Sequence, residues 1–384
     1  MQLRRNFGPI KGEFYHSRPL HWPNLRALGG KTQERATMQK RLDNPYRGQG
    51  IAGLAPLPIA SAQGPAQLLA LCPAHSETPL LALPDLAQVA GVGALYVKDE
   101  RGRMGLGSFK ALGAAYAIAR LAAQAVESDH WAQALAGRVF VTASAGNHGL
   151  SVAAGARIFG AQAVIYLSET VPADFASRLQ GFGATVVRAG ATYEASMEAA
   201  ASAAAAAGHT LLSDSSWPGY HDLPLRVMEG YVQMAAEAAR QMPQPPTHIL
   251  LQAGVGGLAG AVAAHARAQW GDGPQIIVVE PDAAPALIES IRAGAITTTE
   301  GPVSDMGRLD CKTPSMIALA GLSRDADVFV TLSEAEAHRA IARMGDLGLA
   351  TSPSGGAGVA ALLSGLDLGP DACVLAFVSE GPVQ

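Results

Sequence analysis

Short apolar runs alternate with helix-forming stretches along most of this chain. The apolar runs predict buried strands, which we place at 94–98, 137–142, 161–167, 185–188, 210–212, 248–252, 275–280, 327–331 and 372–378. Between them, high helix propensity predicts helices over 110–126, 150–159, 172–182, 193–207, 258–270, 283–293, 314–320, 333–346 and 355–365. Strict alternation of strand and helix is typical of parallel sheets covered by helices, so we predict an α/β fold.

A proline-rich segment divides this pattern into two halves. A long helix follows the irregular loop at 213–220 and ends at residues 243–246, whose sequence is Pro-Gln-Pro-Pro. Prolines stop helices, and the alternation of strand and helix restarts directly after them. We therefore predict a second parallel sheet in the C-terminal half, and a length of 384 residues also favours two domains over one.

The composition narrows the class of protein. The chain is 49% hydrophobic and 16% charged and contains 43 glycines, which is typical of globular α/β enzymes. A net charge of −4 gives no general attraction to nucleic acid or to anionic membranes. Three widely spaced cysteines, Cys72, Cys311 and Cys373, indicate neither a disulfide framework nor a metal cluster, so we predict no metal site. We expect a cytoplasmic enzyme with neither nucleic acid nor membrane as a partner.

The first fifty residues differ from the rest, because lysines and arginines outnumber acids there. No apolar run follows them, so the segment does not have the pattern of a secretory signal. It is compatible with a flexible arm, with an arm that contacts another subunit, or with an extension upstream of a start near Met38.

Lys110 lies at a predicted strand–loop–helix junction, a position that favours the deprotonated form of a lysine. The run 94–98 predicts a buried strand, a loop follows it, and a helix begins at about Lys110. A helix N-terminus disfavours cations, and burial also lowers the pKa of a lysine. The sequence thus allows a deprotonated amine that forms Schiff bases. The alternative is an ordinary surface lysine beside a helix cap.

Three further loops follow predicted strands, where doubly wound folds bind ligands. The glycine loop at 254–257 opens a helix and could offer its amides to a phosphate, or it could simply be a tight turn. The loop at 144–149 could bind a carboxylate, although helix capping by Ser144 or Asn147 and a structural His148 are equally plain interpretations. Asp214 could act as an acid or base, or could cap a turn.

Together these motifs resemble a known family. Lys98-Asp99-Glu100, Ser108-Phe109-Lys110, the 144–149 loop, the 254–257 loop and Ser379-Glu380-Gly381 occur in an order that is similar to the fold-type II pyridoxal-phosphate enzymes. Within that family, the segments at 214–231 and 252–256 are similar to the diaminopropionate ammonia-lyases. The resemblance covers roughly residues 75 to 381.

The resemblance implies a role for each matching residue, with pyridoxal 5'-phosphate as the cofactor. Lys110 would hold the cofactor as a Schiff base and move the α-proton, and Asp214 would be an acid or base. Asn147 would bind the ring hydroxyl, and the hydroxyl of Ser379 would face the ring nitrogen. The phosphate would be bound by Gly254, Val255, Gly256, Gly257 and Leu258. The substrate carboxylate would be bound by Ser144, Ala145, Gly146, Asn147 and His148.

The resemblance also implies the fold and its division. It predicts two doubly wound parallel-sheet domains of the tryptophan synthase β-like type. Residues 1–50 would be a basic N-terminal arm, 51–105 together with 230–384 a larger cofactor-binding domain, and 106–229 a smaller mobile domain. We also expect a homodimer.

The implied reaction is β-elimination on a small amino acid, with 2,3-diaminopropionate converted to pyruvate and ammonia as the leading candidate. One position departs from the lyases, which carry an aspartate where this chain has Ala145, and that departure puts D-substrates in doubt. A serine/threonine-type dehydratase, or a lyase for a related β-substituted amino acid, is the alternative in the same chemistry. A non-catalytic protein that binds an amino acid and a nucleotide-binding dehydrogenase are the remaining hypotheses.

Overall fold

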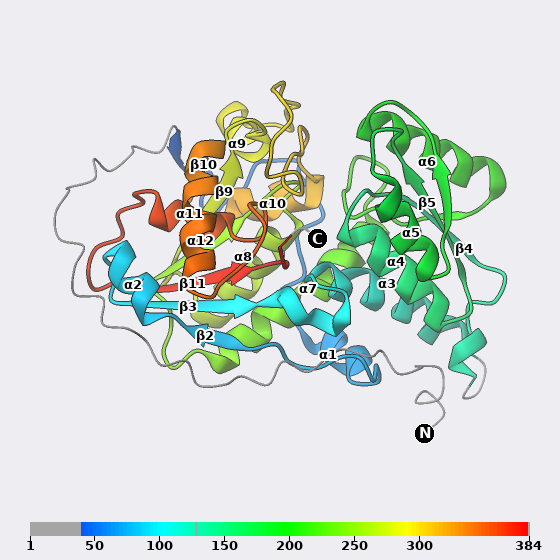
Figure 1. Ribbon diagram of the computed structural model, residues 1–384, viewed down its shortest axis with the longest axis horizontal. Coiled ribbons are helices and arrows are strands. Elements are labelled where there is room, and N and C mark those ends of the chain that lie inside the picture. The colour runs from blue at the N-terminus through cyan, green and yellow to red at the C-terminus, as the bar shows by residue number, and fades with distance from the viewer. Residues whose placement is uncertain (1–39, 127–129, 383–384) are drawn as a thin grey trace.

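The computed structural model describes residues 40–126 and 130–382, and in these ranges the chain forms two sheets, each covered by helices (Figure 1). The larger sheet has seven strands in the order β1-β10-β9-β8-β11-β3-β2. Their bounds are β1 Arg41–Asp43, β10 Val328–Leu332, β9 Gln275–Pro281, β8 His248–Gln252, β11 Cys373–Val378, β3 Ala94–Asp99 and β2 Leu80–Ala82. The five strands from β10 to β3 are parallel to one another, as the alternation pattern predicts.

The two edge strands of this sheet are both antiparallel to their neighbours, and β1 was not predicted. Each has only three residues, too few to show a period of two. β2 is joined to β3 by residues 83–93, a shorter link than most crossovers between parallel strands. β1 lies inside the expected basic arm, so residues 41–43 belong to the larger sheet, whereas residues 1–39 of that arm lie outside the described residues.

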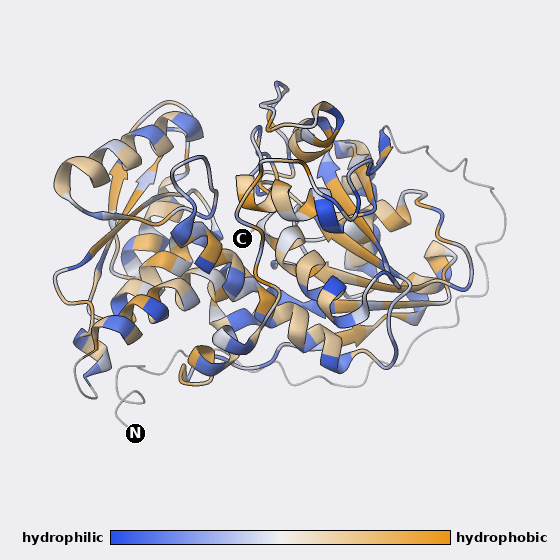
Figure 2. Cartoon of the chain, turned by 180° about the vertical axis from the view of Figure 1, so that it is seen from behind, coloured by the Kyte–Doolittle hydropathy of each residue, from blue (hydrophilic) through white to orange (hydrophobic). Residues whose placement is uncertain are grey.

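Helices cover both faces of the larger sheet because the central strands are apolar on both faces. Ile249 and Leu251 of β8 pack on one face with helices α7, α8, α9 and α10, whereas Leu250 packs on the other with α2, α11 and α12. Figure 2 shows the apolar strands enclosed between these helices. The helices are α1 Gln63–Leu69, α2 Pro84–Ala90, α7 Asp222–Gln241, α8 Gly257–Trp270, α9 Ala286–Ala293, α10 Met316–Asp325, α11 Glu334–Asp346 and α12 Ala357–Leu363.

The smaller sheet has four parallel strands in the order β6-β5-β4-β7. Val141 and Ala143 of β4 pack against helix α6, while Phe140 faces the opposite side, toward α3 and α4. The strands are β4 Val139–Ala143, β5 Gln162–Leu167, β6 Thr185–Arg188 and β7 Thr210–Leu211. The helices are α3 Lys110–Ala125, α4 Asn147–Ile158, α5 Ala173–Gly181 and α6 Tyr193–Ala207, and two short 3-10 helices are η2 Glu100–Gly105 and η3 Trp131–Gln133.

The expected domain boundaries remain a prediction. The boundary placed at residue 230 falls inside α7, which is one continuous helix that packs against both α3 and α8.

None of the helices in the described part of the chain combines the length and the apolarity that a bilayer crossing needs.

Two glycines let α3 and α7 approach closely, and this contact positions the start of α3. A Cβ atom on Gly230 of α7 would lie 2.6 Å from the carbonyl oxygen of Leu112. A Cβ atom on Gly113 of α3 would lie 2.4 Å from the ring of Tyr231. Both distances are shorter than real Cβ contacts, so the two helices can pack this closely only where neither residue has a side chain.

A fully buried ionic network fixes the segment that leads to α3. Lys98, Glu100, Arg103 and Glu237 are each 0% exposed at their side chains. Glu237 of α7 accepts from Arg103 at 2.6 Å and lies 2.8 Å from the Lys98 amine. Burial opposes the charge of Glu237, but the bonds from Arg103 and Lys98 outweigh it and lower its pKa to about 2. Two positive and two negative groups therefore balance one another without water.

We expect Gly230→Ala to destabilise the protein, because the added methyl group meets backbone rather than a movable side chain. Overpacking of this kind costs roughly 1–3 kcal/mol of unfolding free energy. Gly345→Ala in α11 is the matched control, since a Cβ there meets nothing within 4 Å and alanine favours a helix. Urea unfolding measures both, and equal stability of the two variants would contradict the role of the α3–α7 contact.

We expect Glu237→Gln to cost about 3–5 kcal/mol at neutral pH, because it leaves buried cations without their partner. The folded pKa of Glu237 lies below the ordinary 4.5, so its contribution is complete above pH 4.5 and is lost as the pH falls toward about 2. The stability gap to the wild type should thus be constant from pH 7 to pH 5 and narrow below it. Surface Glu77→Gln is the control. A gap that narrows above pH 6 would instead implicate the neighbouring His75.

Candidate active site

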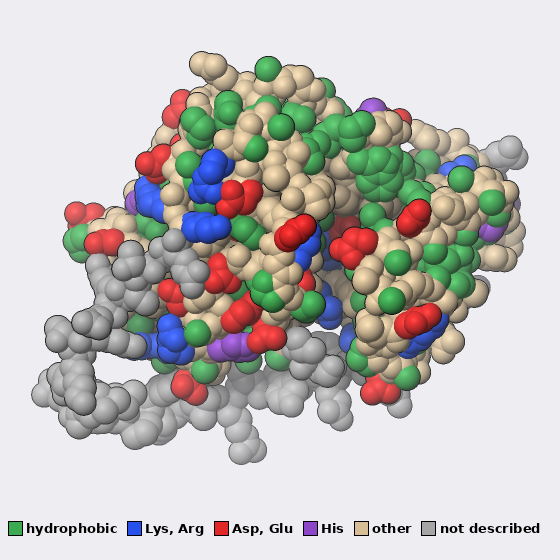
Figure 3. Space-filling model, turned by 90° about the horizontal axis from the view of Figure 1, so that it is seen from above, with side chains coloured by type: hydrophobic (Ala, Val, Ile, Leu, Met, Phe, Trp, Pro, Cys, Tyr) green, Lys and Arg blue, Asp and Glu red, His purple; other side chains and the backbone are tan. Residues whose placement is uncertain are grey.

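Loops at the carboxyl ends of strands from both sheets surround a single cavity of about 300 Å³. They follow β4 in the smaller sheet and β8 and β11 in the larger one. Seen from above, the surface is hollowed between the two halves of the molecule, with acidic and basic side chains at the rim (Figure 3). The structure brings every residue that the sequence singled out to this cavity: Lys110, Ser144, Ala145, Gly146, Asn147, His148, Asp214, Gly254, Val255, Gly256, Gly257, Leu258 and Ser379 all line it.

Lys110 is the first residue of α3, and its amine forms an ion pair with a carboxylate. Its Nζ donates to Oδ2 of Asp214 at 2.5 Å, although the two residues are 104 positions apart in the chain. Burial by itself would lower the pKa of Lys110, as we expected, but the charge of Asp214 outweighs burial and raises that pKa. The expectation of a depressed lysine pKa is therefore wrong for this arrangement. Asp214 conversely has a pKa well below its usual range, since the opposing effect of burial is overcome by Lys110.

Aromatic rings form the wall around this amine. The Lys110 Nζ lies 5.3 Å from the ring centroid of Phe109 and 5.6 Å from that of Tyr231. The two rings contact each other with centroids 4.8 Å apart. The rings shield the amine on this side, while the side chains of Lys110 and Asp214 stay 21% and 15% exposed, so solvent screens the charges of the pair only in part.

The loop before α4 is shaped by Ser144. Its Oγ accepts from the amide of Gly149 at 3.0 Å and from that of Gly146 at 3.3 Å, so its hydroxyl satisfies one amide in the first turn of α4. The N-cap residue is Gly146, so the prediction of Ser144 or Asn147 as the N-cap is wrong. His148 is buried and its Nε2 donates to the carbonyl oxygen of Leu212 at 2.8 Å. Burial lowers the pKa of His148, so it is a neutral ring that ties α4 to the end of β7.

Asn147 is held by a residue to which the sequence analysis gave no role. Its Nδ2 donates to Oε2 of Glu380, a buried residue that directly follows Ser379. The other carboxylate oxygen of Glu380 accepts from Ser352 Oγ at 2.5 Å. The bond between Asn147 and Glu380 joins the start of α4 in the smaller sheet to the end of β11 in the larger one.

The glycine loop after β8 has the form of an anion cradle. α8 begins at Gly257, and the amides of its first turn have no acceptor within the helix. Gly256 has φ +94°, a left-handed conformation that favours glycine, and a Cβ on Gly254 would lie 2.9 Å from Cys311 Sγ. The steric explanation for these glycines therefore applies, and the same bare backbone that makes the turn leaves the amides accessible, so anion binding by this loop stays a prediction.

These groups fit pyridoxal phosphate. A primary amine suits its aldehyde, a glycine-lined helix N-terminus suits its phosphate, and the Ser379 hydroxyl at the cavity wall suits its ring nitrogen. The cavity also exposes Lys110 and the α8 N-terminus to the same space.

Sequence reasoning missed several lining residues, including Tyr193, Gln252, Arg308, Cys311 and Glu380. Arg308 and Cys311 lie in the segment at 294–315, which has no helix or strand and no periodic pattern that could have indicated them. Cys311 is half-buried there, and the burial of its thiol raises the pKa of that group to about 12. Only the tertiary contacts of Arg308 and Cys311 identify them as residues that line the cavity.

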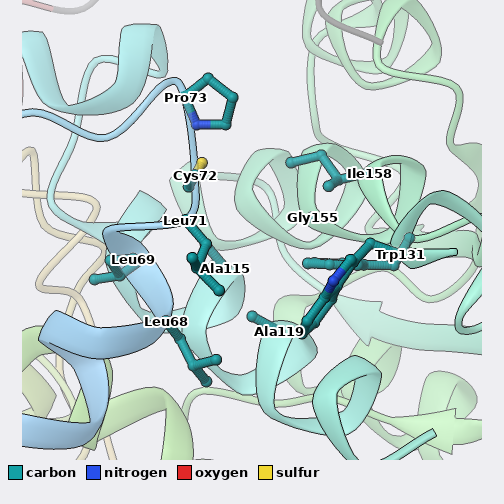
Figure 4. A pocket seen from close by; sticks show the side chains of 11 residues that line it. Leu68, Leu69, Leu71, Cys72, Pro73, Ala115, Ala119, Trp131, Gly155 and Ile158 are labelled. Atoms are coloured by element: carbon teal, nitrogen blue, oxygen red, sulfur yellow. The ribbon is translucent and has the colours of Figure 1, made fainter. Parts of the chain in front are cut away.

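Two other features lie outside this cavity. A smaller apolar cavity of about 40 Å³ lies between the segment at 68–73 and helices α3 and α4, with Cys72 and Trp131 in its lining (Figure 4). Asp305, Glu334 and His338 place ligand-type atoms within 4.8 Å of one another at the surface, a grouping that the sequence analysis did not predict.

Comparisons with known proteins agree with this site. Residues 71–380 match the family model described as "Pyridoxal-phosphate dependent enzyme". The diaminopropionate ammonia-lyase of Escherichia coli (strain K12) is 32% identical over 339 residues, covering 80% of this chain and 85% of the relative. The human L-serine dehydratase/L-threonine deaminase is 29% identical, covering 76% of this chain and 84% of the relative. The crystal structure of holo diaminopropionate ammonia lyase from Escherichia coli superposes with a TM-score of 0.81 at 29% identity, covering 90% of this chain and 95% of that one.

The match extends over most of the chain, and the predicted tryptophan synthase β-like α/β fold is confirmed by the likeness to that structure. The chain belongs to the pyridoxal-phosphate dependent enzymes, in their ammonia-lyase family, and pyridoxal phosphate is its cofactor.

Proposed function

We propose that the protein catalyses β-elimination on a small amino acid and releases a 2-oxo acid and ammonia. The observation that carries this proposal is the ion pair of Lys110 and Asp214, an amine and a carboxylate 2.5 Å apart in the cavity that also contains the α8 glycine loop. Chemistry of this kind needs a base at the α-carbon and a group that assists the leaving substituent.

We propose that the residues lining the cavity hold the cofactor as the sequence predicts. Lys110 would hold it covalently, the amides of Gly254 to Leu258 its phosphate, Asn147 its ring hydroxyl and Ser379 its ring nitrogen. When bound, the cofactor supplies a sink for the electron pair that the departing α-proton leaves behind.

The chain's own residues would then move two protons. Lys110 Nζ, once it is free of the cofactor, takes the α-proton, since a neutral amine in a cavity walled by Phe109 and Tyr231 is a strong base. Lys110 gains a positive charge when it takes the α-proton, and Asp214 keeps its own charge while it is paired with that cation. Lys110 loses the positive charge when it passes the proton to the departing β-substituent, and the carboxylate of Asp214 can then bind that substituent as a cation.

Two leaving groups remain candidates. 2,3-Diaminopropionate is supported by the relatives at 32% identity and by the charge of Asp214, which suits an ammonium group. Serine or threonine is supported by relatives at 29–30% identity that carry dehydratase names, and Ala145 lacks the carboxylate that the lyases carry at this position.

We further propose that the protein is a cytoplasmic homodimer. Within each subunit, residues 106–229 would move as a smaller domain, and the remaining described residues would form the larger domain.

A substrate panel tests the proposal. Diaminopropionate should yield two ammonia molecules per pyruvate, whereas serine should yield one, so the ratio of ammonia to oxo acid identifies the leaving group. An enzyme that binds the cofactor and amino acids without any turnover would support the non-catalytic alternative instead.

We expect Lys110→Ala to abolish both covalent cofactor binding and turnover. The variant should bind cofactor only reversibly, and borohydride reduction followed by mass spectrometry should find no labelled lysine. Lys40→Ala, which alters a surface lysine, is the control. A Lys110→Ala variant that still attaches the cofactor through another lysine would refute this assignment.

We expect Asp214→Asn to lower kcat/KM on L-diaminopropionate by at least about a hundredfold, the scale for loss of one acid–base group. The loss on L-serine should be smaller, because a hydroxyl substituent has no charge for the carboxylate to bind. Wild-type activity on the D-isomer should be low, with some gain from Ala145→Asp. Equal losses on both L-substrates would show that Asp214 acts through Lys110 alone.

A further inference from the structure

Arg308 stretches across the mouth of the cavity, and the proposed reaction gives it no role. Its backbone oxygen would lie 3.2 Å from a Cβ on Gly254, in the glycine loop of the larger sheet. Its side chain reaches the other wall, where Cδ, Nε and Cζ would lie 3.3–3.5 Å from a Cβ on Gly146. A residue in this position lies beside anything that enters between the two loops.

The guanidinium of Arg308 is only loosely held. Its Nη1 donates to the carbonyl oxygen of Ala145 at 3.3 Å, and its Nε lies 3.7 Å from Glu380 Oε2, too far for a hydrogen bond. The side chain is 40% exposed, although its backbone amide is fixed by Ser354 Oγ at 3.0 Å. The planar guanidinium has five N–H donors, so several stay available to a bound molecule.

The other charged groups of the cavity already have partners. Lys110 pairs with Asp214, and Asp310 accepts from Lys312 at 2.6 Å. Glu380 accepts from Asn147 and Ser352 with its two oxygens. Among the described residues that line the cavity, Arg308 is thus the one strong cation without a hydrogen-bonded carboxylate.

A second feature at the same place also favours an anion. Gly146 is the N-cap of α4, and the amides of Asn147 and His148 in the first turn have no acceptor within the helix. The Arg308 guanidinium packs on Gly146 itself, so the helix N-terminus and the guanidinium face the same small volume. An arginine and free amides together match a carboxylate, which can accept from both.

We propose that Arg308 binds a carboxylate of the amino-acid substrate, between its guanidinium and the N-terminus of α4. This inference rests on the proposed function, because it places the substrate's α-carboxylate at the 144–148 loop. It also gives the cavity two charged ends, with Asp214 for a cationic β-substituent and Arg308 for the carboxylate. If the substrate has a second carboxylate, on its β-substituent, Arg308 could bind that group instead of the α-carboxylate.

The experiment measures ligand affinity, so it does not depend on turnover. Glycine and L-alanine, which cannot undergo β-elimination, are titrated into the cofactor-loaded protein, and binding is followed by the cofactor's absorbance and by calorimetry. Glycinamide and L-alaninamide are the neutral counterparts. Arg308→Gln should weaken binding of the acids by about ten- to hundredfold, the scale for a hydrogen bond to a charged group, and change binding of the amides less than twofold.

Three variants separate this role from a structural one. Arg308→Lys keeps the charge beside Glu380 but not the planar donors, so it should recover only part of the affinity. Arg339→Gln, on the exposed side of α11, should leave all affinities unchanged. Cofactor content and melting temperature report whether each variant is folded. Equal weakening of acids and amides by Arg308→Gln would overturn the proposal, as would unchanged binding of all the acids, L-aspartate included.

Comparing L-alanine with the dicarboxylic ligand L-aspartate shows which carboxylate Arg308 binds. If Arg308 binds the α-carboxylate, Arg308→Gln weakens L-alanine and L-aspartate alike. If it binds a second carboxylate, only L-aspartate is weakened, and the inference holds for a dicarboxylic substrate. A normal dependence on Arg308 together with an inactive substrate panel would leave the inference intact and refute the proposed elimination.

Discussion

The ion pair between Lys110 and Asp214 sets the electrostatics of the whole cavity. Burial opposes the charge of each group, and the charge of its partner outweighs that effect. Together they keep opposite charges in a space walled by aromatic rings. Any event that removes the lysine's charge therefore changes the state of the carboxylate at once, and this coupling joins the two proton transfers that β-elimination requires.

Such a pair works only if its two members are held rigidly, and the fold does this from both sides. The glycines of α3 and α7 let the helix that begins at Lys110 pack tightly, and the buried network around Arg103 fixes the chain that enters it. On the other side, His148 ties the start of α4 to the carbonyl of Leu212, two residues before Asp214. The position of the amine thus depends on helix packing, and that of the carboxylate on a hydrogen bond.

The sequence predicted the parts of this structure that repeat and missed those that depend on single contacts. The strands from β3 to β11 and helices such as α6 and α8 were predicted closely, because apolar runs and alanine-rich stretches bounded by glycine or proline are strong local signals. The edge strand β1 was missed, since three residues carry no period. The sign of the Lys110 pKa shift was wrong because its cause lies 104 residues away. Arg308 and Glu380 were missed as site residues for the same reason: they reach the cavity through tertiary contacts that no local pattern records.

The place of β11 in the larger sheet has a consequence for the order of assembly. This strand lies between β3 and β8, yet the ribosome makes it after both, and it carries Ser379 and Glu380 at its end. Until β11 emerges, a nascent chain has a gap in the middle of its sheet, with two unpaired strand edges facing each other. The cavity also lacks one wall, and Asn147 lacks its partner. The complete cavity therefore forms only after this strand has been made, and until then the exposed strand edges favour aggregation of the chain.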